Sequence, residues 1–133
     1  MHINLIEIPK IEDYRGNIAV LENQAIPFKI KNVYYLFEVS DEYCSVGSAH
    51  KNRQQMLIPL SGSFDVKLDN GKSCKTISLN KPDIALLIKS STWYELLNFS
   101  SDAVCLVIAS EKESKMDIID NYDAFLEYTN HHF

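Results

Sequence analysis

Short runs of apolar and β-branched residues alternate with polar turn residues along most of the chain. Residues 63–68 show this most clearly, because every second position is apolar and falls on one face of an extended segment. The Asn70-Gly71 pair that follows is typical of a type I′ hairpin turn, so a return strand is expected at 73–79. The same reasoning predicts further strands at 3–8, 17–22, 28–39, 55–60, 84–88, 92–98 and 103–110.

Helical periodicity is confined to the C-terminal part of the chain. Apolar residues recur there at intervals of three and four between Ile118 and Leu126, so a helix is expected at about 116–128. Many short strands without alternating helices favour a sandwich or barrel over a βαβ fold. We therefore expect one all-β domain over residues 1–133, with strands at about 2–110 and a short C-terminal α-helix.

Length and charge limit the classes of partner. A chain of 133 residues suits one domain, and its net charge of −5 without a long Lys/Arg run disfavours nucleic acid. A single cationic pocket for a small anion stays compatible with this charge. No apolar stretch is long enough to span a membrane, and Glu7 interrupts the first apolar run, so neither a membrane partner nor a signal peptide is expected.

The cysteines indicate the redox compartment. Cys44, Cys74 and Cys105 are odd in number and widely spaced, which favours free thiols over a disulfide framework or zinc site. We expect all three to be structural, with Cys105 inert because it lies in a continuous apolar run where burial raises a thiol pKa. These features predict a cytoplasmic protein.

His50 is the histidine expected inside the domain, because the others lie near the chain ends. It follows a turn-like stretch and precedes an expected strand, a position typical of a pocket rim. An imidazole transfers protons near neutral pH; a histidine in a surface loop is the alternative interpretation. Because no second imidazole or carboxylate accompanies His50 in the motif, we expect neither a metal site nor another cofactor.

Other candidate residues each have a structural alternative. The Arg15-Gly16 pair lies between two expected strands. It is a candidate phosphate-binding site, because a guanidinium can bind a phosphate through two hydrogen bonds. The alternative is an exposed turn. Tyr34 and Tyr35 are neighbours in one strand, so one phenol is expected in the interior, for packing or for hydrogen bonding. Trp93 suits stacking on a base or sugar, or core packing.

Taken in chain order, these segments carry a resemblance to a known family. They are Arg15-Gly16, 26–35, Ala49-His50-Lys51, Gln55, 62–71, Trp93, 99–110 and 122–125. Together they resemble the sugar-nucleotide 3,4-ketoisomerases, which are small cupins acting on dTDP-4-keto-6-deoxyglucose. The resemblance extends from about Arg15 to Phe125.

The resemblance implies a cupin-type double-stranded β-helix, or jelly-roll barrel, in a homodimer with exchanged N-terminal strands. It implies isomerisation of a dTDP-linked 4-keto-6-deoxyhexose for a 3-amino-3,6-dideoxy sugar of surface glycans. His50 would transfer protons, the Tyr34-Tyr35 pair would supply a catalytic tyrosine, and Arg15 would meet the nucleotide phosphates. The residues expected to bind the substrate or its nucleotide are Arg15, Gly16, Ser48, Lys51, Arg53, Gln55, Trp93 and Tyr94.

Two positions depart from the family pattern. Similar family members usually carry His-Ala-His-Lys closely after Arg-Gly, and Trp-His-Glu further on, where this chain has Ser48 and Tyr94 at the histidine positions. Neither hydroxyl is a base at neutral pH, but both can donate hydrogen bonds to an enediolate. A non-catalytic cupin that binds a nucleotide sugar of the same pathway is therefore the alternative function, with Lys51 and Arg53 as the nearby basic groups.

Overall fold

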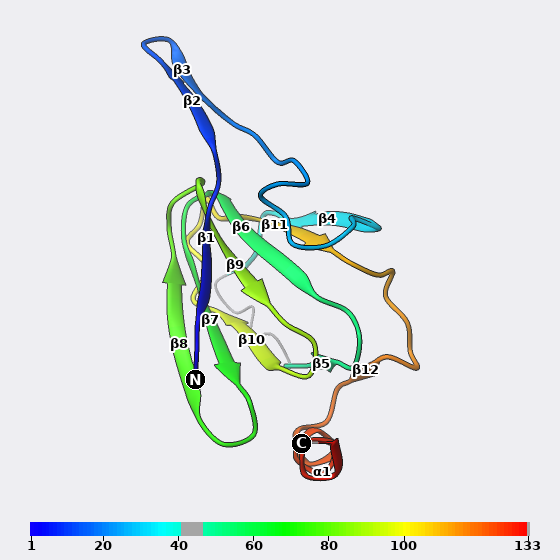
Figure 1. Ribbon diagram of the computed structural model, residues 1–133. Coiled ribbons are helices and arrows are strands. Elements are labelled where there is room, and N and C mark those ends of the chain that lie inside the picture. The colour runs from blue at the N-terminus through cyan, green and yellow to red at the C-terminus, as the bar shows by residue number, and fades with distance from the viewer. Residues whose placement is uncertain (41–46, 133) are drawn as a thin grey trace.

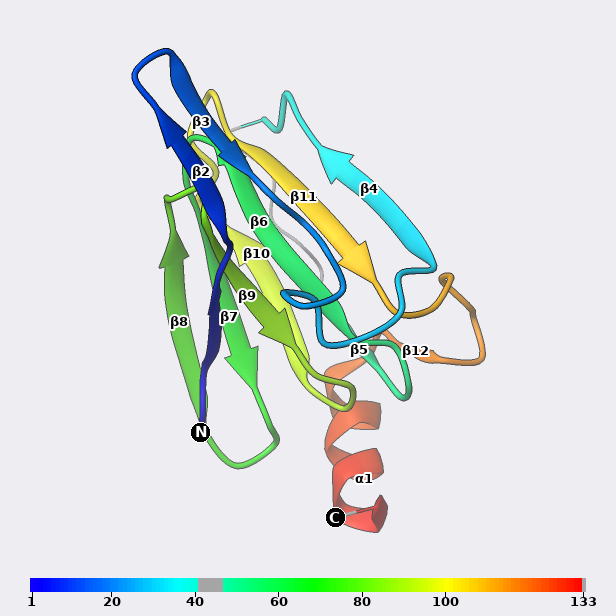
Figure 2. The same ribbon diagram turned by 45° about the horizontal axis from the view of Figure 1, so that its top comes forward.

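Two antiparallel sheets face each other in the computed structural model, which describes residues 1–40 and 47–132 (Figures 1 and 2). One sheet has the strand order β1-β9-β6-β11-β4 and the other the order β10-β7-β8. The strands are β1 (Asn4–Glu7), β2 (Lys10–Asp13), β3 (Gly16–Ala19), β4 (Asn32–Leu36), β5 (Ala49–His50), β6 (Gln55–Ser61), β7 (Phe64–Asp69), β8 (Cys74–Leu79), β9 (Ile84–Ile88), β10 (Trp93–Leu97), β11 (Val104–Ala109) and β12 (Ile118–Ile119). This arrangement confirms the expected all-β, cupin-type fold.

The main core lies between the two sheets. Alternate residues of β7 (Phe64, Val66 and Leu68) face residues such as Leu57 of β6, and all of these are buried. The strands β6, β9 and β11 are apolar on both faces, since Met56 and its neighbours pack on the outside against Ile8, Ile26 and Phe28 from the N-terminal segment. Burial of both faces explains why these strands are continuous apolar runs.

The C-terminal helix α1 (Tyr122–His132) packs on the end of the second sheet. It begins after Asn121, whose side-chain oxygen accepts a hydrogen bond from the backbone N–H of Ala124 at 3.0 Å, an N-cap. The expected helix start near residue 116 was wrong, because Ile118 and Ile119 form β12 and pair with β5. A backbone bridge between Ser48 and Tyr94 connects this pair of strands to β10.

Other expectations differ from the structure in length and turn type. The strand expected at 28–39 is limited to β4, and β2, β5 and β12 were not predicted. The β7–β8 hairpin is present, but its last pair is Asp69–Cys74, which leaves a loop of four residues at 70–73. Only Gly71 has a positive φ there, so the turn is not type I′; the Asn70 side chain instead accepts hydrogen bonds from two loop amides.

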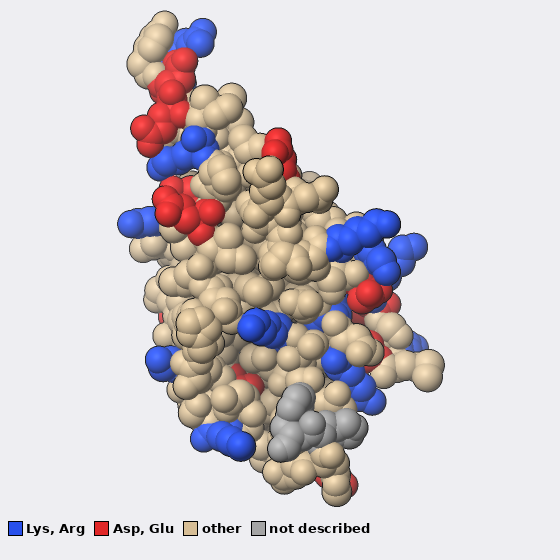
Figure 3. Space-filling model, viewed as in Figure 1, with Lys and Arg blue, Asp and Glu red and all other residues tan. Residues whose placement is uncertain are grey.

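The hairpin β2–β3 projects beyond the body of the protein, at the end opposite to β5, β12 and α1 (Figures 1 and 2). All residues of both strands are exposed. On the face shown in Figure 3, the hairpin carries acidic and basic side chains next to one another, and further basic side chains are dispersed over the body.

Candidate active site

Three side chains meet at the inner face of the first sheet, one each from β4 and β6 and one from the turn before β6. Tyr34 lies opposite Val107, whose side chain is in the core, so the phenol of Tyr34 faces inward. Its O–H donates to Oε1 of Gln55 at 3.4 Å, and the Arg53 guanidinium lies 5.8 Å from the Tyr34 ring centroid. The intervening strand β11 presents Ala109 opposite Gln55, and this small residue leaves room for the side chains to meet.

His50 faces the same interior from β5. Its side chain is buried, and its ring stacks on Tyr94 with 6.1 Å between centroids. Desolvation lowers the pKa of His50, and the positive charge of Arg53 lowers it further, whereas Asp117 and Glu113 oppose the shift. The imidazole is therefore neutral at neutral pH, the form that acts as a general base.

Desolvation has the opposite consequence for Tyr34, which is 40% exposed as a whole residue. It raises the pKa of this phenol to about 12. Tyr34 therefore keeps its proton at neutral pH and serves as a hydrogen-bond donor.

Ser48 and Tyr94, the residues at the two expected histidine positions, are direct neighbours. The N–H of Tyr94 donates to the carbonyl of Ser48 at 2.9 Å, and the reciprocal bond is 3.1 Å. Ser48 precedes His50 by two residues in an extended segment, so the two side chains lie on one face. Among the described residues, the Tyr94 ring is therefore the hydroxyl-bearing group that lies directly against the imidazole, with Ser48 paired to Tyr94 through the backbone.

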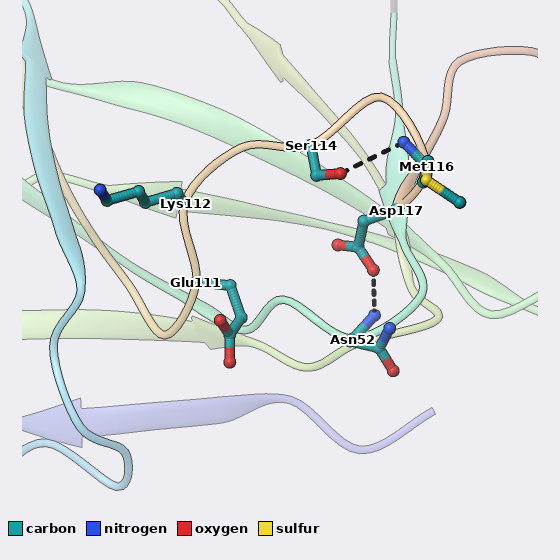
Figure 4. Close-up of a pocket in the computed structure, with 6 residues that line it drawn as sticks. All are labelled: Asn52, Glu111, Lys112, Ser114, Met116 and Asp117. Atoms are coloured by element: carbon teal, nitrogen blue, oxygen red, sulfur yellow. Dashed lines mark hydrogen bonds between the residues drawn. The ribbon is translucent and has the colours of Figure 1, made fainter.

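Asp117 holds the turn that follows His50 and contains Arg53. Its carboxylate accepts hydrogen bonds from the backbone N–H of Asn52 at 2.7 Å and of Arg53 at 3.3 Å, and its carbonyl accepts from Lys51 at 2.9 Å. Asp117 also borders a cavity of about 530 Å³ between this turn and the segment after β11 (Figure 4). The cavity is lined by Asn52, Glu111, Lys112, Ser114, Met116 and Asp117, and so lies outside the cluster around His50.

The structure brings six of the sequence-predicted residues together, and they are Tyr34, Ser48, His50, Arg53, Gln55 and Tyr94. Sequence reasoning missed Asn32, which accepts a 3.5 Å hydrogen bond from Nη2 of Arg53, and Asp117. The only local signal for Asn32 was a polar residue at the start of an apolar strand.

The remaining predicted residues lie elsewhere. Tyr35 is on the opposite face of β4 beside Phe37, and Lys51 is exposed near the Tyr128 ring. Trp93 is buried against Phe125 of α1.

Arg15 and Gly16 belong to the projecting hairpin, where Arg15 forms an ion pair with Asp13 at 3.1 Å. That hairpin is at the end of the molecule away from β5 (Figure 1). Arg15 therefore does not join the cluster of its own chain.

The cysteines are unconnected with this cluster. Burial raises the pKa of Cys105 to about 12, as expected for an inert thiol, and Cys74 is exposed. Cys44 lies outside the described residues. Within the described part of the chain, no three His, Cys, Asp or Glu residues are grouped as metal ligands, and no helix is long and apolar enough to cross a membrane.

The fold, with a buried histidine beside the end of its two facing sheets, defines a small cupin domain. The chain belongs to the family described as FdtA: WxcM-like, C-terminal, which matches residues 1–130. A TDP-4-oxo-6-deoxy-alpha-D-glucose-3,4-oxoisomerase from Aneurinibacillus thermoaerophilus is 40% identical over 129 residues, covering 96% of this chain and 93% of the relative.

Solved structures agree with this assignment. The WlaRB TDP-quinovose 3,4-ketoisomerase from Campylobacter jejuni is 42% identical, with a TM-score of 0.89 over 94% of this chain and 97% of that one. A sugar 3,4-ketoisomerase from Thermoanaerobacterium thermosaccharolyticum in complex with TDP is 34% identical, with a TM-score of 0.93 over 98% and 96%. The expected membership of the sugar-nucleotide 3,4-ketoisomerase family, and with it the enzyme class, is confirmed.

Proposed function

We propose that this protein converts a dTDP-linked 4-keto-6-deoxyhexose into its 3-keto isomer, with His50 as the general base. The observation that carries this proposal is a buried imidazole that stacks on the Tyr94 ring and whose pKa is lowered by desolvation and by the Arg53 cation. The relatives named as TDP-sugar isomerases support the substrate class. The product would supply an aminotransferase that makes a 3-amino-3,6-dideoxy sugar for surface glycans such as lipopolysaccharide, in the cytoplasm.

The reaction moves a carbonyl group between neighbouring carbons. His50 removes the proton from C3, the C–H electron pair forms the C3=C4 double bond, and the ketone π electrons move to O4. The O3 hydroxyl proton then passes to O4, and the O3 electrons form the new C3=O3 carbonyl. The C3=C4 π electrons take a proton at C4 from the protonated His50, which returns the imidazole to its neutral form. Tyr34, with its raised pKa, and the hydroxyls of Ser48 and Tyr94 donate hydrogen bonds to the developing oxyanion.

We propose that this reaction needs no metal. The neighbouring ketone already acidifies the C3 proton, so a positioned base together with hydrogen-bond donors accounts for the step. The alternative is that the protein is a non-catalytic cupin that binds a nucleotide sugar of the same pathway. The replacement of two expected histidines by Ser48 and Tyr94 supports this alternative.

We also propose that the protein is a homodimer with exchanged N-terminal segments. Hairpin β2–β3 exposes Ile11, Ile18 and Tyr14, and the outer face of β4 exposes Val33 and Tyr35. Covering these apolar side chains by a second copy would remove them from water. In such a dimer, Arg15 would meet the nucleotide phosphates in the pocket of the other subunit.

The test is to incubate the purified protein with dTDP-4-keto-6-deoxyglucose and follow the sugar protons by NMR. We expect a 3-keto product with the unmodified protein and none with His50→Asn, while calorimetry shows that His50→Asn still binds dTDP. Binding without turnover by the unmodified protein would instead identify the non-catalytic cupin. Equal turnover by both proteins would exclude His50 as the base.

A further inference from the structure

We infer that Arg53 is a catalytic residue whose guanidinium binds O3 and O4 of the reacting sugar and stabilises the enediolate. This inference rests on the proposed isomerisation. It goes further by assigning the charge that stabilises the intermediate to a residue outside the expected histidine positions.

The first observation is a buried cation with unused hydrogen-bond donors. The side chain of Arg53 is 2% exposed, and its Nε and Nη1 have no hydrogen-bond partner within residues 1–40 and 47–132. Its remaining nitrogen, Nη2, makes only a 3.5 Å contact with Asn32, and no described carboxylate forms an ion pair with the guanidinium. A buried charge without partners is costly, so this arrangement favours a ligand that brings negative charge.

The second observation is the direction of this side chain. Arg53 precedes Gln55 and Leu57 by two and four residues in an extended segment, so it shares their inward face. The Arg53 guanidinium lies over the Tyr34 ring, 5.8 Å from its centroid, and Arg53 follows His50 by three residues in the turn between β5 and β6. The unused donors therefore belong to the interior that holds the proposed base.

The third observation concerns the missing histidines. Ser48 and Tyr94 offer hydroxyl groups but carry no positive charge near neutral pH. When His50 takes the C3 proton, negative charge appears on O4 and is shared with O3 as the second proton moves. A planar guanidinium with several free donors suits two oxygens on neighbouring carbons.

The test compares Arg53→Met, which removes the charge, with Arg53→Lys, which keeps it. We expect Arg53→Met to lower kcat by about 10²–10³-fold, the range seen when an oxyanion donor is removed, with the Kd for dTDP changed by less than about threefold. Arg53→Lys should retain more activity than Arg53→Met. Millimolar guanidinium ion should partly restore kcat in Arg53→Ala, which a purely structural role for Arg53 does not predict.

Circular dichroism and thermal melting check the fold of each variant, and exposed Lys115→Met is the matched control for loss of a positive charge. A kcat for Arg53→Met within threefold of the unmodified protein would overturn the inference. A loss of dTDP affinity equal to the loss of kcat/KM would also overturn it, by showing that Arg53 binds the nucleotide. Absence of turnover in the unmodified protein would overturn the proposed function together with this inference.

Discussion

Replacing Asp117 by Ala removes the carboxylate that holds the turn between β5 and β6. The short hydrogen bond from the Asn52 N–H, at 2.7 Å, goes to a charged acceptor, a type worth about 1.5–3 kcal/mol, and partial exposure places it near the lower value. The longer bond from the Arg53 N–H, at 3.3 Å, adds roughly 0.5 kcal/mol. We therefore expect the free energy of unfolding to fall by about 2 kcal/mol.

This loss has a functional consequence because the turn follows His50 directly and contains Arg53. The hydrogen bond from Lys51 to the carbonyl of Asp117 remains in Asp117→Ala, so the turn is loosened rather than released. Small displacements of a catalytic group lower the rate strongly, and we expect kcat to fall by about tenfold or more. Asp117→Asn keeps one acceptor oxygen and should lose about half as much stability, roughly 1 kcal/mol.

Urea unfolding and steady-state kinetics measure both effects on the same preparations. Asp117→Ala should lower the urea midpoint at an unchanged slope, whereas Ala at exposed Asp120 should leave both the midpoint and kcat unchanged. An unchanged midpoint and unchanged kcat in Asp117→Ala would refute the reasoning that this carboxylate positions the catalytic turn.

Three further predictions follow from the geometry. Gly47→Ala should lower the free energy of unfolding by about 1–3 kcal/mol, because Gly47 has a φ of +74° and an added Cβ would lie 2.5 Å from Trp93 Cζ2. An unchanged melting temperature would contradict this. The acid limb of kcat/KM should lie below pH 6.5, since burial and Arg53 lower the pKa of His50 against the opposing influence of Asp117 and Glu113. Arg53→Met removes one lowering influence and should move that limb to higher pH; a limb that stays or moves lower would contradict the coupling. If Arg15 acts in the site of the other subunit, mixing the inactive Arg15→Ala and His50→Asn proteins so that their subunits exchange should restore about a quarter of the activity. No recovery of activity would exclude that arrangement.

The sequence predicts the strands whose local pattern is strong. Strand β7 is found from its alternation, and β9 and β11 from their apolar runs, because burial of one or both faces produces these patterns locally. Strands β5 and β12 have two residues each and exist through the pairing of His50 with Ile118, far away in the chain. No local signal marks such a pair, and the periodicity of residues 118–126 therefore suggested a helix that began too early.

The candidate site is predicted in part for the same reason. The alternation of a strand establishes that Tyr34 and Tyr35 face opposite sides, but only the register with β11 shows that Tyr34 faces inward. The hydrogen bonds of Asp117 connect it to Asn52 and Arg53, which are separated from it by 65 and 64 positions in the sequence. The packing of Trp93 depends on where α1 docks. Contacts of this kind are properties of the folded chain and have no local signature.

The central claim is that His50 removes the C3 proton of a keto-sugar nucleotide. The most direct measurement is exchange of that proton with solvent deuterium, followed by NMR on dTDP-4-keto-6-deoxyglucose in deuterated water. The account predicts that the unmodified protein exchanges the C3 proton and that His50→Asn does not, although both bind dTDP. Exchange at the same rate in both proteins, or no exchange in the unmodified protein, would contradict it.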